Sequence, residues 1–221
     1  HIAQHYGAVP PAFAQTIALA AHQKAGQYSI SNLRFGLLEL FLGSALLLCW
    51  TLFGGLQWLN TTLLQWLAPG LWQQMALVVA FVAISSLLDL PLSLYKTFVL
   101  EQKFGFNKTT FALWLADSVK GLLLGALLGL PLLALLLWLM AQAGQWWWLY
   151  AWGALLAFQL IMMVIAPLWI APLFNKFQPL EDESLKQRAL ALMQQAGLRA
   201  QGFFIMDGSR RSAHSNAYFT G

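Results

Sequence analysis

Two long stretches of the chain contain no charged residue. One runs between Glu39 and Asp89, and the other between Lys120 and Lys176. Because about 20 apolar residues are enough for a helix to cross a bilayer, each stretch is long enough for more than one crossing. Only 9% of the residues are charged and 59% are hydrophobic, whereas about 25% of an average soluble domain is charged. The sequence therefore predicts an integral membrane protein and excludes a water-soluble globule.

Short polar breaks divide the chain into four predicted transmembrane helices. The breaks hold Gly and Pro between residues 54 and 70, charged residues between 101 and 108, and Ala-Gly-Gln at 143–145. The predicted spans are 34–55, 74–98, 117–142 and 146–172. We therefore expect an all-α polytopic membrane domain over residues 1–180.

After Pro179 the composition becomes that of a soluble domain. Acidic residues at 181–183 favour a helix start, and Gly197 favours its end. The apolar residues between them recur at helical spacing: Leu185, Ala189, Leu192, Met193 and Ala196. Residues 202–206 and 214–220 are predicted to be two short strands separated by a turn at 207–209. Residues 181–221 are thus predicted to begin an α+β domain.

The basic residues predict one orientation for all four spans. Lys and Arg near the ends of spans favour the cytoplasmic side, and all three basic segments fall on the same side of the predicted topology. These segments contain Lys24 and Arg34, then Lys96, Lys103 and Lys108, then Lys176, Lys186, Arg188 and Arg199. The two other links carry no charge and are rich in Trp, which suits the membrane interface. We expect the domain after residue 180 to be cytoplasmic.

Ionisable residues within the predicted spans need a partner or a water-filled cavity. Asp117 and Lys120 are three residues apart on a helix, so we expect them to pair with each other. Asp89 lies two residues before Pro91, and a proline within a span leaves backbone carbonyl groups without their helical hydrogen bonds. Asp89 could therefore line a polar cavity or have a packing role. Glu39 is close enough to Arg34 to reach the membrane surface.

Residues 207–218 are unusually polar, but the residues themselves name no catalytic centre. His214 is expected to be a hydrogen-bonded structural residue, since no H-E-x-x-H motif is present. A Ser-His-Asp triad is rejected because neighbours on one strand alternate faces. The lone Cys49 predicts no internal disulfide or thiolate metal cluster. The net charge of +4 reflects a few short basic segments, so we predict no nucleic-acid partner.

Three segments resemble a known family. They are residues 172–177 (Pro-Leu-Phe-Asn-Lys-Phe), 179–181 (Pro-Leu-Glu) and 207–221, which ends in His-Ser-Asn-Ala-Tyr-Phe-Thr-Gly. Together they strongly resemble the type I CAAX prenyl endopeptidases, which are membrane-embedded zinc metallopeptidases. The loop at 101–110, with Asp117 and Lys120 after it, is similar to the amino-terminal membrane domain of that family.

The resemblance implies a ring of tilted helices around a water-filled chamber. Asp89, Asp117 and Lys120 would then face the chamber. The family's substrate-binding edge strand corresponds to Ser215, Asn216, Ala217 and Tyr218. An edge strand binds extended peptides through its unpaired backbone groups, which fits a peptide or protein substrate.

The resemblance also implies that the catalytic machinery is not in this chain. The zinc ligands and the general-base Glu would lie beyond Gly221, and the family's first transmembrane helix would precede His1. Zinc would polarise the scissile carbonyl and activate water. No catalytic or metal-ligating residue is expected here, and the chain alone is expected to be inactive.

Two hypotheses of function follow. The first is a zinc metalloendopeptidase whose substrate is prenylated or is another membrane-associated protein. The alternative is a non-catalytic chamber protein that binds peptides or partner proteins on the 215–218 strand. A solute transporter is weaker because no paired broken helices suggest inverted repeats. The composition favours a bacterial inner membrane, with the endoplasmic reticulum membrane as the alternative.

Overall fold

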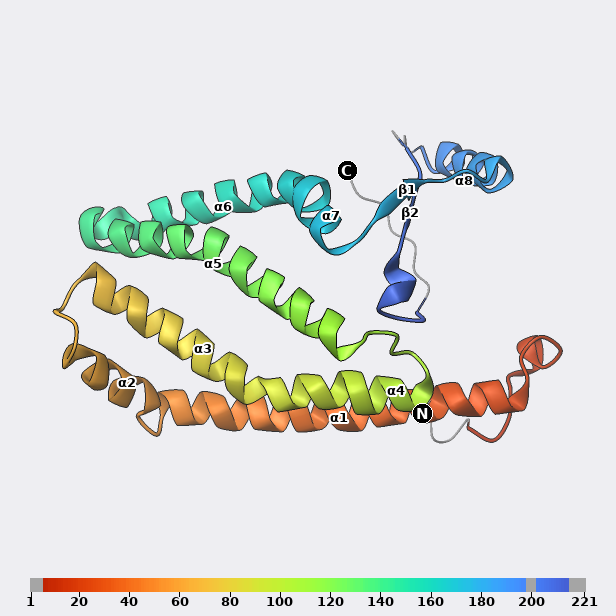
Figure 1. The fold of residues 1–221 in the computed structure, drawn as a ribbon, viewed down its shortest axis with the longest axis horizontal. Coiled ribbons are helices and arrows are strands. Elements are labelled where there is room, and N and C mark those ends of the chain that lie inside the picture. The colour runs from red at the N-terminus through yellow and green to blue at the C-terminus, as the bar shows by residue number, and fades with distance from the viewer. Residues whose placement is uncertain (1–5, 198–201, 215–221) are drawn as a thin grey trace.

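Most of the chain forms long helices that run along one axis (Figure 1). The computed structural model describes residues 6–197 and 202–214. In chain order its helices are η1 (Pro11–Phe13), α1 (Leu19–Thr51), α2 (Gly55–Leu64), α3 (Leu71–Tyr95), η2 (Lys96–Glu101), α4 (Gln102–Phe104), α5 (Phe111–Gln142), η3 (Gly144–Trp146), α6 (Trp147–Ile165), η4 (Ala166–Ile170), α7 (Ala171–Phe174), α8 (Glu183–Gln195) and η5 (Gly208–Arg210). The segments η2 and η4 are π-helical, and the other η segments are 3-10 helices.

Four helices in the described part of the chain are long and apolar enough to cross a membrane. Two of them are α1 and α5 alone. The other two are composite: α3, η2 and α4 form one continuous helix over Leu71–Phe104, and η3, α6, η4 and α7 form another over Gly144–Phe174. The predicted polytopic helical fold with four membrane helices is therefore confirmed.

The helices extend further than the predicted spans. Helix α1 begins at Leu19 instead of residue 34, and α5 begins at Phe111 instead of residue 117. The apolar pattern marks the part that lies in hydrocarbon, whereas a helix can continue into water, where Lys24 and Arg34 are solvated. The structure also forms the short helix α2 within a segment that was expected to be a link.

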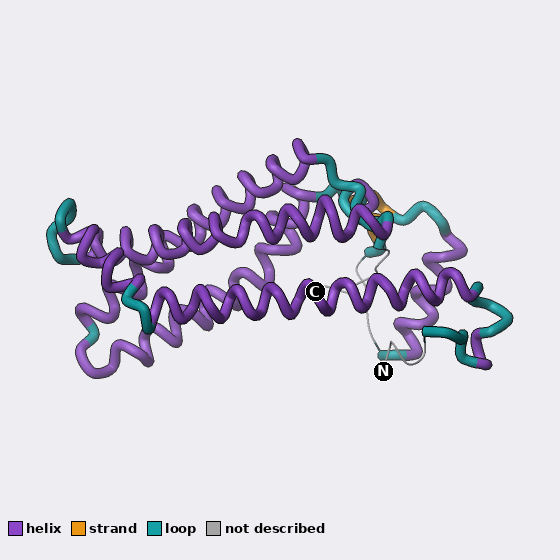
Figure 2. The backbone as a smooth tube through the Cα atoms, turned by 90° about the horizontal axis from the view of Figure 1, so that it is seen from below, coloured by secondary structure: helices purple, strands orange, loops and turns teal. Residues whose placement is uncertain are grey.

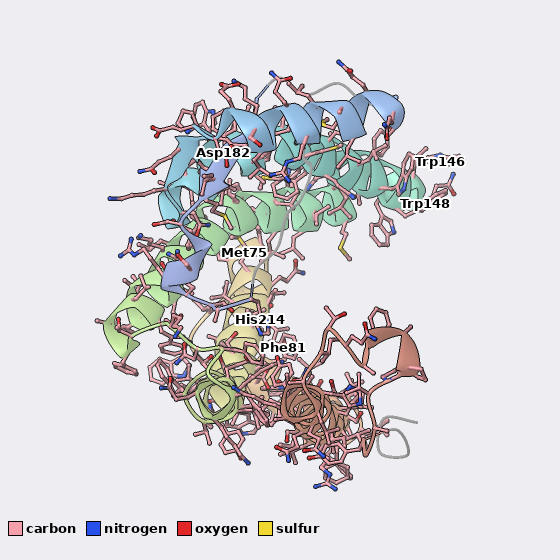
Figure 3. All side chains as sticks on the ribbon, turned by 90° about the vertical axis from the view of Figure 1, so that its right-hand side faces the viewer. Met75, Phe81, Trp146, Trp148, Asp182 and His214 are labelled. Carbon is pink, nitrogen blue, oxygen red and sulfur yellow. The ribbon has the colours of Figure 1, made fainter. Side chains whose placement is uncertain are left out.

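The two uncharged links lie at one end of the molecule. Figures 1 and 2 show α2 and η3 at that end, with α4, α7 and the strands toward the other end. We call these the uncharged end and the charged end. Seen from the charged end, the helices follow an open arc (Figure 3).

Many side chains on the long helices are exposed in the absence of lipid. Phe41 on α1 is 70% exposed and Leu127 on α5 is 69% exposed. A helix that is apolar on every side suits a membrane environment. The buried apolar residues among those described are few and lie between neighbouring helices: Phe35, Trp50, Leu59, Leu100, Phe104 and Ala151.

A small soluble unit follows α7. Strand β1 (Phe177–Pro179) pairs antiparallel with β2 (Phe204–Met206), with Gln178 opposite Ile205. Helix α8 connects them, and the Asp182 carboxylate caps it by accepting a hydrogen bond from the Leu185 N–H at 2.9 Å. Helix α8 and β2 were predicted, but β1 was not. The second predicted strand, 214–220, lies outside the described residues from position 215 onward.

Candidate functional site

Arg211 joins three segments at the charged end. Its Nε and Nη2 atoms donate to the two carboxylate oxygens of Asp117 on α5, at 2.7 and 3.1 Å. Nη1 donates to the side-chain oxygen of Asn175 at 2.9 Å, and Nη2 also donates to the Phe174 carbonyl at 2.6 Å. A bidentate guanidinium–carboxylate pair is strong and fixes geometry. The Asp117 carboxylate raises the pKa of Arg211 above its ordinary value, so Arg211 stays charged.

The prediction that Asp117 pairs with Lys120 was wrong. Asp117 binds Arg211 instead, and the Lys120 Nζ donates to the Leu173 carbonyl at 3.1 Å. Lys120 also lies 5.9 Å from the Phe174 ring centroid. The planar fork of Arg211 matches both carboxylate oxygens, which a single ammonium does not. Both cations therefore connect α5 to the end of α7.

The loop between α4 and α5 pairs with the segment around Arg211. The Ala213 N–H donates to the Phe106 carbonyl at 2.9 Å, and the Lys108 N–H donates to the Arg211 carbonyl at 3.1 Å. Asn107 and Ser212 face each other in an antiparallel bridge. The loop therefore pairs through its backbone with residues 211–213, which are about a hundred positions away in sequence.

Side chains within that loop fix its shape. Asn107 is 9% exposed; its side-chain oxygen accepts from the Thr109 N–H at 2.8 Å, and its amide donates to Gln102 at 3.0 Å. The Thr110 hydroxyl then caps α5 by accepting from the Leu113 N–H at 3.2 Å. Gly105 has φ +80, in the left-handed region that favours glycine. These local bonds hold the loop in the conformation that pairs with Arg211 and Ala213.

His214 packs against the same loop. Its ring stacks on Phe106, with centroids 4.0 Å apart and planes inclined by 18°. Its Nε2 lies 3.5 Å from a carboxylate oxygen of Glu101, and the Tyr28 hydroxyl donates to the other oxygen at 2.8 Å. Figure 3 labels His214 on the inner side of the helical arc. Contacts from α1, η2 and the loop therefore hold the residue that immediately precedes the predicted substrate strand.

Asp207, just after β2, forms two hydrogen bonds with Lys176, just before β1. Its carboxylate accepts from the Lys176 N–H at 2.8 Å, and its own N–H donates to the Lys176 carbonyl at 3.1 Å. Arg210 lies 3.4 Å from the second carboxylate oxygen. The Lys176 hydrogen bond, helped by Arg210, lowers the pKa of Asp207 below its ordinary value. Asp207 was expected only as part of a turn, because its partner is distant in sequence.

The remaining predicted site residues are not gathered with Arg211. Ser215, Asn216, Ala217 and Tyr218 lie outside the described residues. Asp89 is exposed on α3 and forms no hydrogen bond or ion pair with any residue that the structure describes. Among the described residues, no group of three His, Cys, Asp or Glu side chains could hold a metal ion. The described residues therefore do not fit a zinc site.

Comparison with known proteins identifies a family. Residues 1–176 match the family model described as the CAAX prenyl protease N-terminal region with five membrane helices. A CAAX prenyl protease 1 homolog of Oryza sativa is 45% identical over 137 residues, which are 62% of this chain and 32% of that protein. The Homo sapiens homolog is 31% identical over an alignment of 230 positions, which covers 96% of this chain and 46% of that protein.

A solved structure of the same family has a similar fold. The crystal structure of Ste24p from S. mikatae superimposes with a TM-score of 0.85 at 34% identity, covering 99% of this chain and 52% of that chain. This chain thus spans about a third to a half of the length of the relatives it matches. Sequence, membrane topology and fold agree, and the chain belongs to the CAAX prenyl protease family.

Proposed function

We propose that this chain is the membrane part of a zinc metalloendopeptidase that hydrolyses peptide bonds in an intramembrane chamber. Two observations support the proposal. The first is membership of a family whose relatives are named CAAX prenyl proteases. The second, which carries it, is the set of contacts from Arg211, Phe106 and His214 that holds the chain just before the predicted substrate strand.

In this proposal, the described residues position substrate instead of cleaving it. The 106–108 loop pairs with residues 211–213, so contacts from the membrane domain hold the chain shortly before the predicted substrate strand Ser215–Tyr218. An extended peptide would add to that strand by backbone hydrogen bonds. Asp89, Asp117 and Lys120 are proposed to line the chamber wall. The zinc ligands and the general base are proposed to come from sequence beyond Gly221, and no catalytic step is assigned to the described residues.

The substrate is proposed to be a peptide or protein with a prenylated carboxyl terminus, bound from the bilayer or from the charged end. That end is proposed to be cytoplasmic because the basic loops gather there. The membrane is proposed to be a bacterial inner membrane, with the endoplasmic reticulum membrane as the alternative. Fractionation of cells that express the tagged protein distinguishes the two locations.

The test is cleavage by the complete protein in detergent, with zinc measured on the same material. A farnesylated peptide and its unprenylated counterpart are incubated with the protein, and products are identified by mass spectrometry. We expect cleavage with about one zinc per chain, loss of cleavage with a chelator and recovery with added zinc. Peptide binding without cleavage, in zinc-loaded material, would instead support the non-catalytic chamber protein.

A further inference from the structure

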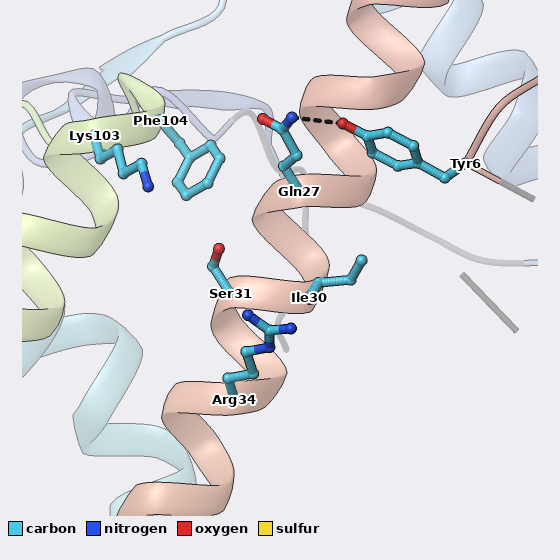
Figure 4. A pocket seen from close by; sticks show the side chains of 7 residues that line it. All are labelled: Tyr6, Gln27, Ile30, Ser31, Arg34, Lys103 and Phe104. Carbon is cyan, nitrogen blue, oxygen red and sulfur yellow. Dashed lines mark hydrogen bonds between the residues drawn. The ribbon is translucent and has the colours of Figure 1, made fainter. Parts of the chain in front are cut away.

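A pocket of about 350 Å³ opens between α1 and α4, away from the Arg211 contacts (Figure 4). Its lining residues are Tyr6, Gln27, Ile30, Ser31, Arg34, Lys103 and Phe104. Figure 4 shows Lys103 and Phe104 on one wall, facing Gln27, Ser31 and Arg34 on α1.

The pocket presents cations and neutral polar groups but no carboxylate. None of the described lining residues is acidic. Within residues 6–197 and 202–214, neither Arg34 nor Lys103 forms an ion pair. The nearby acidic residues are already engaged, since Glu39 pairs with Lys96 at 3.6 Å and Glu101 binds Tyr28. No described residue therefore supplies an anion to this pocket.

The polar groups of the pocket suit a phosphate. A guanidinium and an ammonium on opposite walls can both donate to phosphate oxygens, and such charge-assisted hydrogen bonds are stronger than neutral ones. The Ser31 hydroxyl lies between them in Figure 4, while the Gln27 amide donates to the Tyr6 hydroxyl. Lys24 adds a third cation on the same face of α1, with its Nζ 4.0 Å from where a Cβ on Gly105 would lie.

Arg34 lies at the edge of the apolar part of α1. It is the first residue of the predicted span 34–55, and the next charged residue, Glu39, is about 7.5 Å further along the helix. A cation at the start of an apolar span is close to the lipid headgroup layer, which is about 5–7 Å thick on each side of the hydrocarbon core. Ile30, Leu33 and Leu37 follow one another at spacings of three and four, so they share one face of α1. Leu33 and Leu37 are 61% and 67% exposed, which leaves an apolar track for an acyl chain below the cations.

We propose that the pocket lined by Arg34, Ser31 and Lys103 binds the phosphate headgroup of an anionic phospholipid. Basic pockets between transmembrane helices are a recurrent mode of anionic lipid recognition. The bound lipid would link α1 to α4 through charge. This proposal does not depend on peptidase activity, so either can fail without the other.

The test measures lipid affinity of the complete, delipidated protein by native mass spectrometry. The probes are phosphatidylglycerol and phosphatidylcholine with identical acyl chains, and inorganic phosphate. The pocket variant is R34Q/K103Q. The matched control is K108Q/R188Q, which removes the same charge from exposed residues of the charged end outside the pocket. The variant R34K/K103R keeps both charges and reports on folding.

We expect phosphatidylglycerol to bind the unaltered protein at least tenfold more tightly than phosphatidylcholine. R34Q/K103Q should weaken phosphatidylglycerol binding about tenfold and abolish the preference, whereas K108Q/R188Q and R34K/K103R should keep it. Equal weakening in K108Q/R188Q would overturn the proposal in favour of general surface attraction. Inorganic phosphate binding as tightly as the lipid, and lost in R34Q/K103Q, would overturn the lipid assignment in favour of a soluble anion.

Discussion

The two ends of the helical bundle are held together in different ways. At the uncharged end, the Gln73 amide donates to the Asn60 side-chain oxygen at 2.7 Å, and these residues are 13 positions apart. At the charged end, Arg211 binds Asp117 across 94 positions and receives the Thr109 hydroxyl hydrogen bond across 102. The first kind of contact closes a turn between consecutive helices. The second holds a segment that is distant in sequence against the membrane helices.

The contacts at the uncharged end order the membrane helices, whereas those at the charged end place residues 207–214. Helices in a bilayer associate through close packing and a few polar contacts, so short links suffice to order α1, α2 and α3. The placement of residues 207–214 is not dictated by lipid, because that segment is polar. It depends on charge pairing and backbone bonds to the loop before α5. Substitutions at the charged end should therefore disturb the predicted substrate strand, Ser215–Tyr218, more than substitutions of equal energetic cost at the uncharged end.

The largest expected effect comes from removing the Arg211 guanidinium. Arg211→Ala loses four hydrogen bonds and leaves Asp117 without a partner in a site where both side chains are less than a quarter exposed. Breaking such a pair should cost about 3 kcal/mol of unfolding free energy. Thermal unfolding of the protein in detergent measures this loss, and peptidase activity of the complete protein should fall at least tenfold.

Arg210→Ala is the matched control for that prediction. Arg210 carries the same charge one position away, but its side chain is 55% exposed and its contact to Asp207 is 3.4 Å long. Exposed ion pairs contribute about 0–1 kcal/mol, so this variant should unfold close to the unaltered protein. Equal destabilisation by Arg210→Ala and Arg211→Ala would contradict the role given to the Asp117 pair.

One glycine with positive φ at each end allows the two ends to be compared by substitutions that should cost a similar backbone conformational free energy. Gly105 at the charged end and Gly144 at the uncharged end have φ +80 and +57, and no side chain would clash with an added Cβ at either. Alanine in this conformation costs about 1–2 kcal/mol. Gly105→Ala and Gly144→Ala should lower the unfolding temperature by similar amounts, but only Gly105→Ala should reduce peptide cleavage. A similar loss of cleavage in both variants would erase the distinction between the ends.

A smaller effect is expected for the polar contact at the uncharged end. Gln73 is 5% exposed, and Gln73→Leu removes its amide donor, which leaves the side-chain oxygen of Asn60 without that hydrogen bond. The expected cost is about 0.6–1 kcal/mol, measured by thermal unfolding. The double variant Q73L/N60L should regain most of the loss because both polar partners are then absent. Peptide cleavage should not change in either variant.

The fold was predictable where the bilayer imposes a length. The absence of charge between Glu39 and Asp89 and between Lys120 and Lys176, together with the short polar breaks, predicted the four membrane helices. Helix ends were not predictable in the same way, since α1 continues outside the apolar stretch to Leu19. Strand β1 has only three residues, ends in Pro and shows no alternating pattern, so it carried no signal.

The site was predictable only in part, because its contacts are distant in sequence. Spacing on a helix suggested Lys120 as the partner of Asp117, and nothing local to Arg211 indicated that it would bind across 94 positions. The polar density of residues 207–218 made the segment a candidate site but identified no catalytic centre. The assignment of Ser215–Tyr218 to substrate came from the family resemblance and remains a prediction.

The smallest expected effect is that of protonating Asp207, which should weaken only the contacts next to the start of β1. Its pKa is lower in the folded protein than in the unfolded chain, so its contribution is complete above the unfolded pKa and is lost as pH falls through the folded value. Protonation should weaken the Lys176 N–H bond, and amide exchange at Lys176, corrected for the intrinsic rate, should accelerate at acidic pH. In Asp207→Asn the amide oxygen can still accept the bond but cannot titrate, so the acid-dependent acceleration should vanish. An identical pH profile in Asp207→Asn would mean that a group other than Asp207 controls the exchange at Lys176.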